Sequence, residues 1–111
     1  MPLKLNEDAF AHAQQLIQQH RVDREGDWAS HQPTTESKNK YLASHTYKEY
    51  GNWFLGENSD ANPNTKEQYE FPYGNFKKLF LSGIIAAEQR AGQYKHVEIE
   101  AATKRLLEMI G

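Results

Sequence analysis

Apolar residues recur at helical spacing through the C-terminal part of the chain. Over 76–91 they follow the i, i+3, i+4, i+7 pattern of one helical face, and flanking apolar positions widen that face. Gly83 and Ala87 leave room there for a close neighbour. Gly92 suits a left-handed C-terminal cap, and a further helix is expected over 97–110. The pattern therefore predicts a helical hairpin.

Two shorter helices are expected in the N-terminal half. Asn6 suits an N-cap, because its side chain can accept a hydrogen bond from an unpaired amide of the first turn. Acidic residues follow it at the positive end of the helix dipole, and apolar residues then recur over 7–20. A shorter helix is predicted over 36–46. The segment 21–34 has neither a helical nor a strand period, so it is expected to be a loop anchored by Trp28.

Two short aromatic-rich segments, 50–56 and 68–73, are predicted to be strands. In the second, Tyr69 and Phe71 alternate with polar positions, and the turn formers of 57–64 lie between the two segments. Two strands alone are marginal in water, so they should pack against the helices. The predicted fold is α+β, with four helices and a C-terminal helical hairpin packed on a short antiparallel two-stranded sheet.

Length and composition set limits on the class of protein. A chain of 111 residues fits a single domain over 1–111. It has no cysteine, so stability has to come from packing, to which 13 aromatic residues contribute. No stretch approaches the roughly 20 apolar residues of a membrane span, and the N-terminus lacks the pattern of a secretory signal. The expectation is a soluble, cytoplasmic protein without a membrane partner.

The sequence predicts no metal site and no cofactor. None of the five histidines has the spacing that places two imidazoles on one helical face. The run 60–64 matches the first half of a calcium-binding loop. The match then fails, because Thr65 stands where glycine is needed and Phe71 where a bidentate glutamate is needed.

No catalytic signature is recognised either. Ser44 and His45 are the only adjacent serine and histidine, but neighbours on a helix point in different directions. The sequence therefore favours a non-enzymatic protein. A small enzyme without a recognisable motif is the third interpretation, and a pocket that encloses His45 with a carboxylate would favour it.

Ten of the 13 aromatic residues fall between Trp28 and Phe76. Such a belt either builds the core of a chain with few aliphatic residues, or forms part of a binding surface. On the second interpretation the protein is an interaction module with a protein partner. The candidate interaction surface then consists of Tyr50, Trp53, Tyr73, Lys77, Lys78 and Arg90.

A nucleic-acid-associated or phage-linked accessory protein is the alternative function. Its candidate contacts are Lys77, Lys78, Arg90, Lys95, Lys104 and Arg105. A sequence pI near 6.2 disfavours this alternative, because binding to a phosphate backbone needs many cationic contacts. The oligomeric state is open, since Leu81, Ile85 and Met109 could complete a dimer seam if they are exposed.

Three segments resemble a family of short uncharacterised bacterial proteins. They are Glu-Tyr-Gly-Asn-Trp-Phe-Leu-Gly at 49–56, Tyr-Glu-Phe-Pro-Tyr-Gly-Asn-Phe-Lys-Lys at 69–78, and Ser-Gly-Ile-Ile-Ala-Ala-Glu-Gln-Arg-Ala at 82–91. A looser likeness, over 71–110, is to a small module in tailed-phage proteins. The resemblance implies a bacterial origin and a shared fold, and it supplies no catalytic residues.

Overall fold

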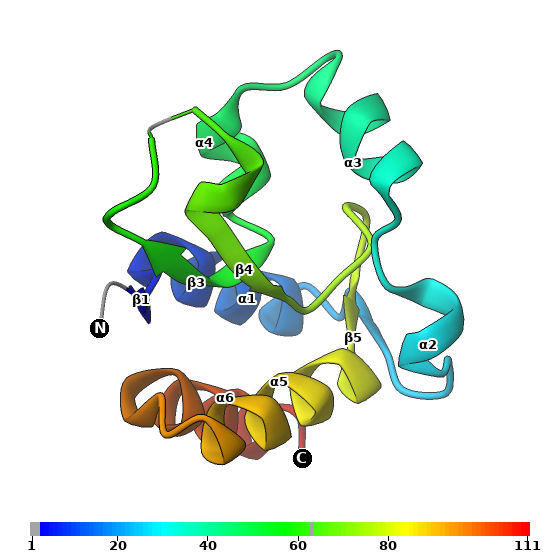
Figure 1. The fold of residues 1–111 in the computed structure, drawn as a ribbon. Helices are drawn as coiled ribbons and strands as arrows, with labels where there is room; N and C mark the ends of the chain where they lie inside the picture. The colour runs from blue at the N-terminus through cyan, green and yellow to red at the C-terminus, as the bar shows by residue number, and fades with distance from the viewer. Residues whose placement is uncertain (1–2, 63) are drawn as a thin grey trace.

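The computed structural model describes residues 3–62 and 64–111, and it shows an α+β fold (Figure 1). The hairpin of α5 and α6 lies on one side of the sheet, and α3 and α4 lie on the other. The helices are α1 (Glu7–Gln18), α2 (Trp28–His31), α3 (Thr35–Leu42), α4 (Tyr47–Gly51), α5 (Leu81–Gln93) and α6 (Val97–Ile110). The strands are β1 (Leu3–Leu5), β2 (Val22–Asp23), β3 (Phe54–Asn58), β4 (Tyr69–Pro72) and β5 (Leu79–Phe80), and a 3₁₀ turn covers Lys66–Gln68.

The expected antiparallel strand pair is confirmed, but it is part of a larger sheet. β3 pairs with β4 in a register that places Gly56 opposite Glu70, and β1 adds a third strand on the other side of β3. Asn6 fixes the end of β1. Its amide donates to the carbonyl oxygen of Leu55 at 2.8 Å, and its side chain donates to those of Gly51 and Phe54 at 2.9 and 3.1 Å. The expectation of two strands is therefore corrected to three.

The C-terminal helical hairpin is confirmed, but its first helix begins later than the pattern predicts. Residues 76–80 form a turn and β5, and α5 begins at Leu81. β5 pairs in parallel with β2, with Val22 opposite Leu79. This pairing buries the apolar residues 79 and 80, whose spacing otherwise continues the helical pattern. The strand β2 lies within the segment that was expected to be a loop.

The end of α5 corrects the predicted role of Gly92, which lies inside the helix. The left-handed residue is Lys95, with φ of 61°. Its amide donates to the carbonyl oxygen of Gly92, and the amide of His96 donates to that of Ala91, which is the Schellman pattern. α1 ends in the same way with His20 at φ of 60°.

The N-terminal helices are shorter than predicted. α1 and α3 end a few residues earlier than the pattern indicates, and α4 occupies the start of the segment 50–56 that was expected to be a strand. A capping box explains this last difference, because the Thr46 hydroxyl accepts from the amide of Glu49 at 3.2 Å, and the Glu49 carboxylate accepts from the amide of Thr46 at 2.9 Å.

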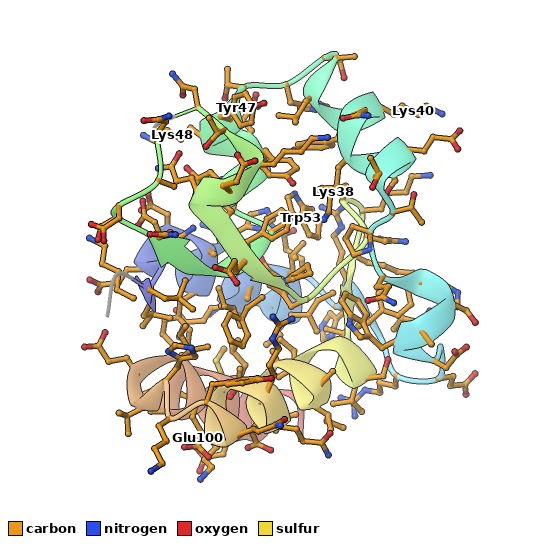
Figure 2. The ribbon with its side chains drawn as sticks, viewed as in Figure 1. Lys38, Lys40, Tyr47, Lys48, Trp53 and Glu100 are labelled. Atoms are coloured by element: carbon orange, nitrogen blue, oxygen red, sulfur yellow. The ribbon has the colours of Figure 1, made fainter. Side chains whose placement is uncertain are left out.

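Half of the aromatic belt is buried in the core. Tyr50 is 1% exposed, Trp53 4% and Tyr73 0%, and all three contact the buried cluster that joins the sheet to the helices. Figure 2 shows Trp53 in the interior of the molecule. The structure therefore corrects the expectation that these three rings form a surface. Within the described part of the chain, none of the helices combines the length and apolarity needed to span a membrane.

Candidate functional site

A groove of about 670 Å³ opens between helices α2 and α3 on one side and the turn at 75–77 on the other. Both helices lie at the edge of the molecule in Figure 1, and Figure 2 labels Lys38 and Lys40 on α3. Two aromatic rings, Tyr41 and Phe76, form part of its lining, together with hydroxyl, amide and cationic side chains.

The α2 wall is set by one short, capped helix. The Asp27 carboxylate accepts from the amide of Ser30 at 3.1 Å and from its hydroxyl at 2.9 Å, which starts α2. His31, at the end of α2, stacks on Phe80 with ring centroids 4.7 Å apart. Its Nδ1 lies 2.9 Å from the carbonyl oxygen of Asp27. Because that oxygen only accepts, Nδ1 carries the proton and Nε2 remains for a ligand.

A column of stacked rings runs from the groove into the core. The His45 ring lies flat on Tyr41, with centroids 3.8 Å apart and an interplanar angle of 1°. Tyr41 stacks on Phe76 at 4.5 Å, and Phe76 stacks on the buried Tyr50 at 5.8 Å. Both faces of the Tyr41 ring are therefore covered, and the exposed His45 ring forms the outer end of the column.

The third wall is a tight turn. The Asn75 side-chain oxygen accepts from the amides of Lys77 and Lys78 at 3.1 and 3.0 Å, and Phe76 between them has a left-handed φ of 68°. The Arg21 guanidinium donates to the carbonyl oxygen of Lys77. Lys77 and its exposed ammonium group are thus held at the rim of the groove by contacts of the backbone.

The charge of the groove is of one sign. Its charged and ionisable side chains, apart from the phenol of Tyr41, are those of His31, Lys40, His45 and Lys77, and no aspartate or glutamate is among the lining residues. The chain as a whole has a net charge of −2. The groove is therefore a local concentration of positive charge on a slightly acidic protein.

Two carboxylates near the histidines lie outside the lining and are held in helix caps. The Ser30 side chain donates to Asp27 and lowers the pKa of that carboxyl. The amide of Thr46 donates to Glu49 and lowers its pKa as well. Burial raises the pKa of Tyr41, which keeps its hydroxyl neutral. A ligand in the groove thus meets the histidines and lysines while these acids remain in their caps.

The groove encloses His45, but its geometry does not support acid–base catalysis with Ser44. The His45 Nδ1 lies 3.0 Å from the Ser44 hydroxyl and 3.0 Å from the carbonyl oxygen of Tyr41. Because a carbonyl oxygen only accepts, Nδ1 donates to it and has no lone pair for the Ser44 proton. No carboxylate lines the groove to orient the ring.

The structure separates the six residues of the predicted interaction surface. Tyr50, Trp53 and Tyr73 are buried, and only Lys77 lines the groove. The Lys78 ammonium pairs with Asp23 at 3.1 Å, and the Arg90 guanidinium lies over the Phe71 ring at 5.4 Å from its centroid.

None of the remaining cations of the nucleic-acid interpretation lines the groove. Lys95 lies at the turn between α5 and α6, and the Lys104 ammonium pairs with Glu100 at 3.8 Å. Arg105 is exposed on α6. Among the described residues, no group of three or more metal-ligating side chains is close enough to hold an ion.

The predicted helix over 36–46 includes Tyr41 and His45, but the α2 side of the groove was expected to be a loop. The available signal was Asp27 followed by Ser30, because an aspartate that caps the amide three residues on is a helix-start pattern. No protein-family model, curated protein or solved structure matches this chain.

Proposed function

We propose that this protein is a small, non-enzymatic interaction module that holds an acidic segment of a partner protein in the groove beside α3. The observation that carries the proposal is the charge of the lining, which contains Lys40, Lys77 and two histidines but no carboxylate. Complementary charge of this kind selects acidic partners and speeds their association.

The other lining groups suit a peptide. The Ser30 hydroxyl donates its proton to Asp27, so the lone pairs of its oxygen can accept from the N–H groups of an extended peptide. The edges of Tyr41 and Phe76 add an apolar surface for one side chain of the segment, since aromatic rings contribute strongly to interfaces. A groove of about 670 Å³ is large enough for a few residues of an extended chain.

A single-stranded nucleic acid fits the groove less well. Sequence-independent binding of such strands combines many phosphate contacts with bases stacked on free ring faces. Here Tyr41 is covered on both faces by His45 and Phe76, and the groove contains only two lysines. The chemistry therefore favours an acidic peptide over a polynucleotide.

The test is a titration of isotope-labelled protein followed by amide chemical shifts. The probes are a short capped peptide rich in glutamate, the same peptide with glutamine at each glutamate, and a thymidine oligonucleotide of equal charge. We expect the glutamate peptide to shift amides of 30–45 and 75–77, and to bind less tightly as salt is added. The glutamine peptide should bind at least about tenfold more weakly, since each contact of opposite charges is worth about 1 kcal/mol in water.

A pair of variants with equal charge change separates the groove from general electrostatics. Lys40→Glu with Lys77→Glu reverses both groove lysines, whereas Lys48→Glu with Arg105→Glu reverses two exposed cations elsewhere. Only the first variant should lose binding. Equal losses in both variants, or tighter binding of the oligonucleotide than of the glutamate peptide, would contradict the proposal.

A further inference from the structure

A second hollow, of about 300 Å³, lies along β1 and shares no lining residue with the groove. Its lining includes Leu3, Lys4 and Leu5, together with residues 94–99 of the turn between α5 and α6 and the start of α6. Consecutive side chains of a strand point to opposite faces of the sheet. Since three consecutive residues line the hollow, the feature they share is the backbone edge of the strand.

The register shows which backbone groups of β1 face outward. The amide of Asn6 donates to the carbonyl oxygen of Leu55, so these two residues form a hydrogen-bonded pair of the antiparallel ladder. Such pairs recur at every second residue, so Lys4 and Glu57, which are opposite each other, form the next one. The N–H and C=O groups of Leu3 and Leu5 therefore point away from β3. The sheet order places β1 at the edge, and no described strand pairs with that side.

The rim of this hollow carries exposed apolar side chains. Val97 is 72% exposed and Tyr94 58%, the highest values among the large hydrophobic residues of the described part. Both lie beside β1. Scattered exposed apolar residues are ordinary, but here two of them lie next to an unpaired strand edge.

The charge of Lys4 favours an acidic partner segment over a second copy of the chain at that edge. If a second copy of the chain paired all three residues of its β1 antiparallel across a two-fold axis, Lys4 would lie opposite Lys4 of the other copy. That position is a non-hydrogen-bonded pair, in which side chains are closest, and like charges there are unfavourable. An acidic residue at the same position would instead pair with Lys4.

We propose that β1 accepts an extended segment of a partner protein as an antiparallel fourth strand, with an acidic residue opposite Lys4 and an apolar residue on each side of it. The two apolar residues lie opposite Leu3 and Leu5, and their backbone groups pair with the outward N–H and C=O groups of β1. Their side chains share the face of Leu3 and Leu5 and contact the side chains of Tyr94 and Val97. The acidic side chain lies on the opposite, solvent-facing side with Lys4, which is exposed.

The test uses a capped, palindromic peptide, Thr-Ser-Val-Glu-Val-Ser-Thr, titrated into labelled full-length protein. We expect shifts at the amides of 3–5 and 94–99. Methylation of both valine backbone nitrogens removes the N–H groups that face β1, and should abolish binding. Methylation of the glutamate nitrogen alone removes an N–H group that faces solvent, and should change the affinity less than about twofold.

Two variants of the protein complete the design. Val97→Asp puts a charge on the rim at the first position of α6, where an acidic residue is compatible with the helix, and should weaken binding about tenfold. Gln89→Glu, at an exposed position of α5 outside both hollows, adds the same charge and is the matched control, which should leave binding unchanged. Binding that is lost on methylation of the glutamate nitrogen but kept on methylation of the valines would overturn the proposal. So would self-association of the protein that Val97→Asp abolishes, because the edge would then belong to a second copy.

Discussion

At the scale of single residues, two glycines of α5 have very different surroundings. A Cβ at Gly83 would come within 2.8 Å of the Trp28 ring and 2.9 Å of the carbonyl oxygen of Tyr73. A Cβ at Gly92 would meet only the Glu100 carboxylate, at 2.9 Å from one oxygen, and this is the end of a flexible side chain. The close approach that the sequence predicts at Gly83 is thus confirmed, and its partners are α2 and the residue after β4.

The same substitution should therefore have opposite effects at the two positions. Gly83→Ala is expected to lower the free energy of unfolding by about 1–3 kcal/mol, because overpacking outweighs the roughly 1 kcal/mol of helix propensity that alanine adds. Gly92→Ala should raise it by up to about 1 kcal/mol. Both changes are measured by urea unfolding, in which the dependence of the free energy of unfolding on urea concentration should be the same as in the wild type. Stabilisation by Gly83→Ala would show that α2 moves aside at little cost.

His12 forms a polar contact inside the aromatic core. The Tyr73 hydroxyl donates to the carbonyl oxygen of Asn52 at 2.7 Å, and it has no second proton for His12, whose Nδ1 lies at 3.0 Å. The His12 Nδ1 therefore donates to the Tyr73 oxygen. The His12 ring also meets Trp53 edge to face, with centroids 4.8 Å apart. Burial lowers the pKa of His12. A hydrogen bond with the backbone of Asn52 opposes this shift, and the charge of Arg21 adds to it.

Mild acid should therefore destabilise the fold through His12. The unfolded chain takes up a proton near the ordinary pKa of 6.5, while the folded state resists it until a lower pH. The contribution of His12 to the free energy of unfolding is thus fully present above pH 6.5. It falls as the pH drops from there toward the pKa of His12 in the folded state, with a slope of at most about 1.4 kcal/mol per pH unit.

The check is the free energy of unfolding by urea at a series of pH values, for the wild type and for His12→Gln. The variant should lose most of the slope just below pH 6.5. The carboxyls with lowered pKa values, such as Asp23 at about 2, contribute only at more acidic pH and do not confuse the comparison. An equal slope in both proteins would assign the effect to other histidines.

At the scale of elements, α1 and α5 end in the same geometry without the residue that usually provides it. Each helix closes with a Schellman pattern whose left-handed residue is normally glycine, but here these positions are His20 and Lys95. A side chain with a Cβ costs roughly 1 kcal/mol or more in the left-handed region.

His20→Gly and Lys95→Gly are each expected to raise the free energy of unfolding by about 0.5–1 kcal/mol, since relief of this cost exceeds the added flexibility of the unfolded chain. Gln19→Gly, one residue before and at φ of −86°, is the matched control and should be destabilising. Thermal unfolding of the three variants at one pH gives the comparison. If His20→Gly lowered the free energy of unfolding, the contacts of the His20 side chain would stabilise the fold by more than its left-handed backbone costs.

Local patterns predicted the elements that bury one face over several turns, and missed those made by long-range pairing. The bounds of α6 were predicted, because its apolar spacing lies within the helix itself. β2 and β5 have two residues each and exist only because they pair with one another across the chain. No local period can indicate strands of that length, so the residues of β5 were assigned to the helix that follows.

At the scale of the whole molecule, the groove depends on contacts between segments that are far apart in the sequence. Its walls come from segments near residues 30–45 and 75–77, and their distance is set by the stack of Tyr41 on Phe76. The sequence indicated that Tyr41 and Lys77 belong to separate elements. Their convergence requires the turn held by Asn75.

The packing of α3 is much thinner than that of the other long helices. None of its residues is buried, whereas α1, α5 and α6 each bury at least three. Its contacts with the core include the Tyr41 ring on Phe76, the Lys38 ammonium 5.9 Å from the centroid of Phe54, and the partly buried Leu42. The helix α3, which forms one wall of the groove, is therefore the least firmly packed of these helices.

Native-state hydrogen exchange should show this difference. Amides of α3 are expected to exchange by local opening, with protection more than about tenfold below that of β3 and α6, whose opening requires loss of the core. The measurement is made by NMR at neutral pH in the absence of any ligand. Protection of α3 equal to that of α6 would mean that the helix opens only when the whole protein unfolds.

The ring column also links the groove to an intrinsic fluorophore. Phe76 stacks on Tyr41 at the groove and meets the buried Trp53 edge to face, with centroids 5.9 Å apart. A ligand that displaces the Tyr41 ring therefore changes the packing around an indole that is otherwise sealed from solvent. The emission of Trp53 thus gives an optical signal of groove occupancy that needs no attached dye.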